Sequence, residues 1–178
     1  SGIQASCFYG VDVIGMAPTR LQELRTLSHA ALTSRYTGQS STVDLSIEKV
    51  SLESSLYVRS QPIVWYMAAI WDQLLPRHIL MATWHYAVGC WETLTWKRVK
   101  GPASATVLSL KEIGWKPVSI FIWEDLAGDR VKSLELSPRA LQHRLEVDIQ
   151  GQLSTRLSAR ASTFRALQGQ PWLAPVKE

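Results

Sequence analysis

Two groups of side chains in this sequence have the types that catalysis or metal binding would use. The first is a pair of histidines, His78 and His85, which lie seven residues apart and therefore on one face of a helix, with Cys90 following them. Zinc needs ligands that converge tetrahedrally, usually as closely spaced CxxC or HxxxH pairs, and no such pair occurs. We interpret the histidines as residues of a polar helix face and expect neither a metal site nor a cofactor.

The second group consists of the acids Glu124, Asp125 and Asp129. Such carboxylates can hold the metal ions of a nuclease or polymerase, but turns also recruit Asp to bind their own backbone. We interpret the three as turn residues; an enzyme that uses them with a histidine on a small molecule is an alternative. Because there is also no GxSxG, GxGxxG or phosphate-binding loop, we predict no catalytic residue.

A basic and aromatic segment, "WKRVKGPASATVLSLKEIGWK" (96–116), is the strongest candidate for binding. Residues 97–116 contain five cations and one acid, so their net charge of +4 equals the net charge of the whole chain. The cations are Lys97, Arg98, Lys100, Lys111 and Lys116. We predict that the first three bind backbone phosphates and that Trp96 stacks on a base. Cations near a helix end also complement its dipole, which is the ordinary reason to find them there.

Two further arginines, Arg156 and Arg160, are one helical turn apart beside the inward face of the last expected helix. That spacing would let a helix follow a phosphate backbone. A solvated helix face is an equally good interpretation of the pair.

The elements that must position these residues are mainly helical. Apolar spacing and prolines predict helices over 18–35, from Pro62, and from Pro102 to Ile113. Pro76 either kinks the helix from Pro62 or starts a third one. The second helix has an apolar stripe of Val64, Met67, Trp71 and Leu74; the third has Leu80, Trp84, Ala87, Trp91 and Leu94. Gly114 stands where a left-handed helix end would.

The period changes after residue 117. Residues 118–125 and 130–136 read as two strands of a β-hairpin around the turn "LAGD". Ser137 and Pro138 then start a helix that runs to about Leu167, with Gly151 as its natural kink. Its expected inward residues are Leu145, Ile149, Leu153, Leu157 and Phe164. The predicted fold is therefore a mainly α helical bundle of about five helices with one small β-hairpin near 118–136.

Composition agrees with a globular chain, because 46% of its 178 residues are apolar, 19% are charged and eight are tryptophan. We divide it into residues 1–46, with the first helix and a loop over 36–46; residues 47–116, a Trp-rich helical unit; and residues 117–178, the hairpin and long helix. These form one packed domain or two small units.

We expect Cys7 and Cys90 to be free thiols of an intracellular protein, nuclear or cytoplasmic, with no membrane partner. The start without Met suggests a piece of something longer.

The stretch "CFYGVDVIGMAPTRLQELRTLSHAAL" (7–32) resembles the segment after the polymerase palm in non-LTR (LINE-type) retrotransposon reverse transcriptases. There a "YGxEVWG"-like strand or turn leads into a helix patterned "LxxLRxxxxxAL". Tyr9 and Gly10 stand in that place, and Asp12 replaces the usual glutamate. Residues 96–115 and 121–138 are similar to the region between the polymerase core and an RNase H-like domain in such elements.

This resemblance implies that residues 1–46 are a post-palm segment and that the chain is thumb and connection. Such a segment closes over an RNA or RNA–DNA template–primer duplex, next to the upstream core and a downstream domain of the same protein. The paired aspartates of the polymerase and the acids of RNase H are absent. The resemblance therefore implies a non-catalytic fragment, with Mg-dependent chemistry elsewhere in the parent.

We accordingly predict a reverse transcriptase thumb/connection fragment that grips the duplex backbone without sequence specificity. The alternative is a Trp-rich helical module for protein–protein interaction, with a groove that includes Trp71, Trp84 and Trp91. A decayed copy of a mobile element is a further possibility.

Overall fold

The computed structural model describes residues 10–32 and 54–168, and the side chains of residues 31, 32, 54, 154 and 156–168 lie outside that description. The described helices are α2 Val11–Ile14, α3 Pro18–Leu32, α5 Ser54–Trp71, α6 Arg77–Gly89, α7 Pro102–Glu112 and α8 Pro138–Gln168, with short 3-10 turns at η3 Trp96–Arg98 and η4 Ser133–Glu135. The strands are β1 Lys116–Pro117, β2 Ile122–Glu124 and β3 Arg130–Lys132. The prediction of a mainly helical bundle with a small hairpin is confirmed.

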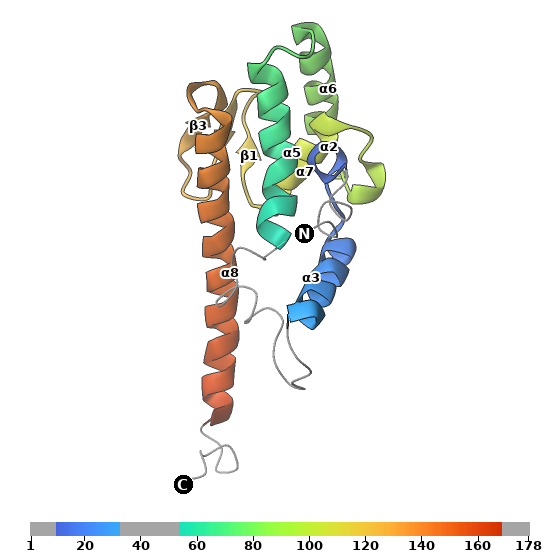
Figure 1. Ribbon diagram of the computed structural model, residues 1–178. Coiled ribbons are helices and arrows are strands. Elements are labelled where there is room, and N and C mark those ends of the chain that lie inside the picture. The colour runs from blue at the N-terminus through green and yellow to red at the C-terminus, as the bar shows by residue number, and fades with distance from the viewer. Residues whose placement is uncertain (1–9, 33–53, 169–178) are drawn as a thin grey trace.

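Helix α5 is the centre of the bundle, because α2, α7 and α8 all pack against it (Figure 1). Its start was predicted wrongly: Pro62 lies inside the helix, eight residues after Ser54. A proline inside a helix removes one backbone hydrogen bond, and here burial on several sides keeps the helix continuous. The Pro62 carbonyl also accepts the Thr106 hydroxyl of α7 at 3.0 Å.

The predicted stripe of α5 was only partly right. Met67 is buried and Val64 is half-buried, but Trp71, the last residue of the helix, and Leu74, which lies beyond it, are exposed. The residues that face the core are instead Ile63, Tyr66, Met67 and Ile70. The phase is shifted because α7 and α8 cover α5 from two sides.

Helix α6 begins directly after Pro76 and ends at Gly89, so the proline starts a helix and does not kink one. Leu80, Trp84 and Ala87 are buried as predicted. The remaining two members of that stripe lie beyond the helix end, where Leu94 is buried and Trp91 is half-buried.

Helix α7 agrees with the prediction in outline, but the strands are shorter than predicted. β2 covers only Ile122–Glu124 of the predicted 118–125, and β3 covers only Arg130–Lys132 of the predicted 130–136, because η4 follows it directly. Gly114 has φ +79° and follows the last turn of α7, where only a residue without a Cβ adopts that conformation cheaply. The strands form an antiparallel sheet in the order β1-β2-β3, with Trp123 paired to Val131. The hairpin therefore gains a third strand, β1, which pairs Pro117 with Trp123.

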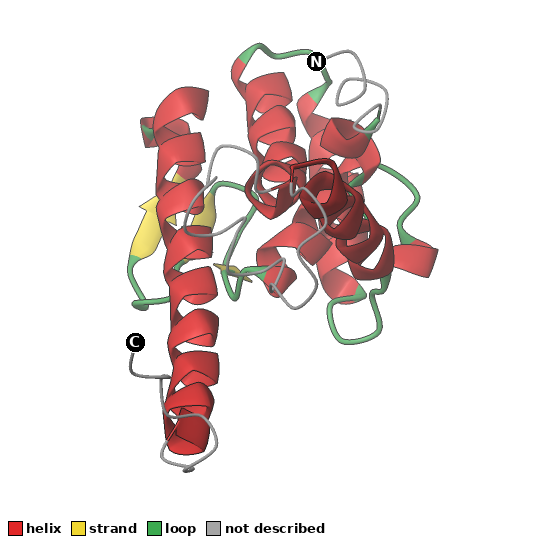
Figure 2. Cartoon of the chain, turned by 60° about the horizontal axis from the view of Figure 1, so that its bottom comes forward, coloured by secondary structure: helices red, strands yellow, loops and turns green. Residues whose placement is uncertain are grey.

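Helix α8 starts as predicted, because the Ser137 hydroxyl accepts the Ala140 N–H at 3.3 Å. Leu141, Leu145, Ile149 and Leu153 are buried. The helix continues without a break through Gly151, and its C-terminal half projects past the other helices (Figures 1 and 2). The predicted inward residues Leu157 and Phe164 lie outside the described side chains, as do residues 33–53, which include the predicted loop, and Cys7.

One core runs from Ile63 to Leu153 and joins the helices to the sheet. Its middle is a row of aromatic rings: Tyr66 of α5 stacks on Trp84 of α6, and Trp84 stacks on Trp123 of β2, at centroid distances of 5.7 and 6.2 Å. Trp115 continues the row at 6.4 Å from Trp123. Val11, Leu21 and Val58 form a second small cluster, while Leu27 of α3 is exposed.

Candidate nucleic-acid interface

The connection from α6 to α7 contains a cationic loop, residues 96–101. Lys97 and Arg98 lie on the 3-10 turn η3, Lys100 follows two residues later, and all three are exposed. None of them has a salt-bridge partner among the described Asp and Glu side chains. The Arg98 guanidinium makes one bond, from Nη1 to the Thr93 carbonyl at 3.3 Å. The three cations predicted to bind phosphate are thus close together and exposed.

Trp96, the residue predicted to stack on a base, is used for packing instead. Its indole N–H donates to Glu112 Oε1 of α7 at 2.5 Å, and its ring is half-buried against the core. The ring also lies directly against Gly15, where a Cβ would overlap it. Trp96 therefore anchors the cationic loop to α7 and to the end of α2.

Glu112 is a half-buried carboxylate. Burial raises its pKa, while the hydrogen bond from Trp96 and the charge of Arg59 act in the opposite direction and leave the pKa above its ordinary value. The anchor of the cationic loop is therefore a part-buried hydrogen bond from the Trp96 indole to a carboxylate.

Ser104 in the first turn of α7 fixes the other end of the cationic loop. Its hydroxyl accepts the backbone N–H groups of Lys100 and Gly101 at 3.1 and 3.2 Å, and donates to the Gly101 carbonyl at 2.9 Å. These two N–H groups are consequently not available to an anion. A phosphate bound near Lys100 would therefore be held by side chains and not by these two N–H groups.

The remaining two cations of the 97–116 segment are engaged elsewhere. Lys111 Nζ donates to the Trp91 carbonyl at 2.6 Å and lies 5.5 Å from the centre of the Trp91 ring. Lys116 pairs with Glu124 across the sheet at 3.6 Å. Arg156 and Arg160 lie on α8 beyond its described side chains, so their relation to the loop stays a prediction.

The acidic group of the sequence is a turn, as we interpreted it. Asp125 Oδ1 accepts the backbone N–H groups of Ala127 and Asp129, both at 2.9 Å, and Oδ2 accepts Arg144 of α8. Burial alone would raise the Asp125 pKa, but the bonds from Arg144 and the two N–H groups outweigh it and lower the pKa. These contacts join the hairpin turn to α8 and give the Asp125 carboxylate a structural role.

Within the described residues, no three His, Cys, Asp or Glu side chains converge as metal ligands would. His78 and His85 are both exposed on α6.

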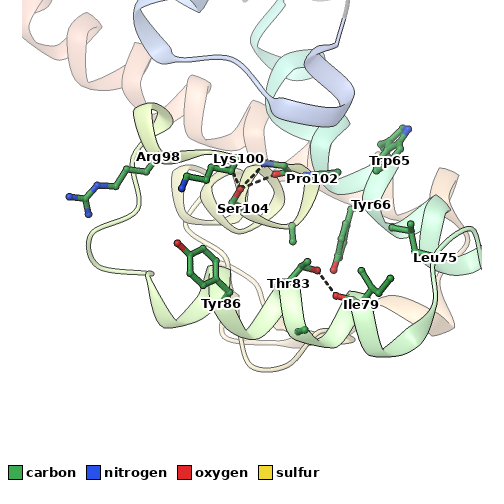
Figure 3. Close-up of a pocket in the computed structure, with 13 residues that line it drawn as sticks. Trp65, Tyr66, Leu75, Ile79, Thr83, Tyr86, Arg98, Lys100, Pro102 and Ser104 are labelled. Atoms are coloured by element: carbon green, nitrogen blue, oxygen red, sulfur yellow. Dashed lines mark hydrogen bonds between the residues drawn. The ribbon is translucent and has the colours of Figure 1, made fainter.

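A groove of about 600 Å³ opens beside the cationic loop between α5, α6 and the first turn of α7. We call it the α5–α6–α7 groove. Its walls are mostly apolar, and it has no acidic lining residue. Figure 3 shows Tyr86 of α6 at the same end as Arg98 and Lys100, and Leu75 at the opposite end.

Tyr66 forms part of the wall of this groove and is 1% exposed. Its hydroxyl is buried and has no partner in hydrogen-bonding geometry among the described residues. Burial raises the pKa of Tyr66 to about 12, with the nearby Thr83 hydroxyl acting weakly against it. Thr83 itself donates to the Ile79 carbonyl at 2.8 Å.

Sequence reasoning missed Tyr86. It is 66% exposed and lines the α5–α6–α7 groove at the same end as Arg98 and Lys100. A tyrosine on the polar side of an otherwise apolar helix was the available signal.

No helix in the described part of the chain has the length and apolar character needed to cross a bilayer. Comparison with known proteins yields no matching family model, no matching curated protein and no matching solved structure.

Proposed function

We propose that the cationic loop binds the phosphate backbone of an RNA–DNA duplex, and that the chain is a non-catalytic thumb/connection fragment of a retroelement reverse transcriptase. The observation that carries the proposal is the exposure of Lys97, Arg98 and Lys100 together, without a described acidic partner. The resemblance of residues 7–32 to a post-palm segment supports the same assignment. Side-chain contacts to phosphate do not read bases, so the binding is sequence-tolerant.

In this proposal the bond-forming chemistry belongs to the Mg-dependent polymerase of the parent protein, and the chain acts inside the cell, in the nucleus or cytoplasm. The fixed ends of the loop support a positioning role. Trp96 is bonded to Glu112, and Ser104 holds the backbone at Lys100 and Gly101. A cation on a fixed backbone loses less freedom on binding than one on a mobile tail.

The test is the salt dependence of duplex affinity, measured by fluorescence anisotropy. Three phosphate contacts give a slope of roughly −2.7 in log K against log salt, which weakens binding about 40-fold when the salt rises fourfold. The triple variant K97E/R98E/K100E should lose most of the affinity and most of this slope.

A matched control makes the same change in net charge on other exposed cations, Arg20, Lys132 and Arg139. Arg20 and Lys132 are in exposed pairs with Glu23 and Glu135, whose loss has little effect on stability. R20E/K132E/R139E should bind nearly as well as the unmodified chain. Equal losses in both variants, or an affinity that ignores salt, would refute a specific role for the cationic loop.

A protein-interaction module is the second candidate, and the apolar end of α5 favours it. Trp71 is 46% exposed and Leu74 is 65% exposed, next to the partly exposed Leu75. The other two tryptophans of the predicted groove do not fit equally well, because Trp84 is buried and Trp91 is half-buried. If this surface binds a flanking domain of the parent, L74D should abolish their co-purification and K97E should not.

A further inference from the structure

The α5–α6–α7 groove lies where the cationic loop ends, and the two features share side chains. Arg98 and Lys100 line one end of the groove and also belong to the phosphate-binding surface proposed above. A strand held by these cations would have its next unit at the mouth of the groove. The question is which chemical group the groove accepts.

The aromatic residue at that end is Tyr86, which is 66% exposed and lines the same end of the groove as Arg98 and Lys100 (Figure 3). Proteins that bind single-stranded nucleic acid combine cations for the backbone with exposed aromatic rings for the bases. Such stacking does not discriminate strongly between bases, and the mostly apolar walls of this groove provide few groups that could.

The size of the groove argues against a docked helix. An α-helix with its side chains is about 10–12 Å across, so a volume of about 600 Å³ holds roughly one helical turn. Helix-in-groove recognition uses anchors spread over two turns or more. The same volume lies within the range of small-molecule sites.

We propose that the α5–α6–α7 groove receives an unpaired nucleotide of a single-stranded extension of the bound duplex. Its phosphate lies between Arg98 and Lys100, and its base stacks on Tyr86 at the groove mouth. This inference rests on the proposed function for the phosphate contacts and adds a site for the base. It assigns to Tyr86 the stacking role that the sequence suggested for Trp96.

The experiment compares three labelled ligands by anisotropy at one salt concentration. They are a blunt RNA–DNA duplex, the same duplex with a short single-stranded extension, and that duplex with an abasic extension of equal length. The abasic ligand keeps the phosphates and lacks the bases. We expect the base-containing extension to bind about tenfold more tightly than the abasic one.

Three variants and one control locate the effect. Y86A should remove the tenfold gain, and A82W should do so by filling the groove, whereas Y86F keeps the ring and should retain it. Y57A removes another exposed tyrosine, on α5 outside the groove lining, and should also retain the gain. All four should bind the blunt duplex with unchanged affinity.

Equal affinity for the two extensions, or a gain that survives both Y86A and A82W, would overturn the inference. Salt-dependent binding of the blunt duplex would then leave the proposed function standing. Binding of the extension through Tyr86 without any binding of the blunt duplex would support the nucleotide site and refute the duplex-gripping function. Displacement of the extension by an acidic, apolar peptide of higher affinity would assign the groove to a protein partner and overturn the inference.

Discussion

Replacing Gly15 with alanine tests the contact that holds Trp96, and with it the cationic loop. Gly15 ends α2 with φ +69° and ψ −167°, a region of backbone space that is almost restricted to glycine. Forcing alanine into it costs about 1–3 kcal/mol. The added Cβ would also overlap the Trp96 ring, and overpacking of this kind costs about 1–3 kcal/mol more.

The chain offers a matched control at Gly10, which has φ +76° but no heavy atom within 4 Å of an added Cβ. G10A therefore carries only the backbone cost, roughly 1 kcal/mol. We expect G15A to reduce the free energy of unfolding by roughly 2–6 kcal/mol in total. The melting temperature of a chain of this size falls by about 2–4 °C per kcal/mol, so the two variants are readily distinguished.

Urea denaturation followed by circular dichroism measures both variants, and a double-mutant cycle with W96A identifies the cause. Removing the indole removes the overlap, so G15A should cost less in the W96A background by about 1–3 kcal/mol. Equal losses for G15A and G10A, or strictly additive effects of G15A and W96A, would show that the ring does not rest on Gly15.

Three further variants test the core and the hairpin turn. Y66F removes a buried hydroxyl without a partner, so it should leave the free energy of unfolding unchanged or raise it by up to about 1–3 kcal/mol. Because the folded pKa of Tyr66 is raised from 10.0 to about 12, the unmodified chain should lose stability between pH 10 and 12 in alkaline melts, and Y66F should lose less. D125N should lower the free energy of unfolding by roughly 1–2 kcal/mol near neutral pH. Since the folded pKa of Asp125 is lowered, the contribution of its carboxylate is present above about pH 4 and lost on acidification, so the stabilities of D125N and the unmodified chain should converge in acid melts. L145A opens a cavity at a fully buried site and should cost about 2–5 kcal/mol in urea melts, against less than about 0.5 for V147A on the exposed side of the same helix.

The elements that the sequence predicted well are those with local start and stop signals. Pro102, Gly114 and the Ser137–Pro138 pair mark helix ends through their own backbone chemistry, and the structure uses all of them. Pro62 carries the same signal but lies inside α5, because packing against neighbouring helices keeps the helix continuous there. Local chemistry could not reveal contacts that form only after folding.

The same limit applies to the candidate site. The cationic cluster at residues 97–100 could be predicted because residue type alone gives the charge. The packing role of Trp96 could not be predicted, since its partners Glu112 and Gly15 are far from it along the chain. Tyr86 comes to the same groove as Arg98 and Lys100 only when α6 packs on α7.

The aromatic row through the core makes the chain a reporter of its own folding. Tyr66, Trp84, Trp123 and Trp115 come from α5, α6, β2 and the connection from α7 to β1, with neighbouring rings 5.7 to 6.4 Å apart. Indoles at such separations couple their electronic transitions, and near-ultraviolet dichroism is sensitive to fixed tertiary packing of this kind. If any one of these segments detached, the coupling between neighbouring rings would be lost there. The near-ultraviolet dichroism band therefore reports the packing of all four regions without an added label.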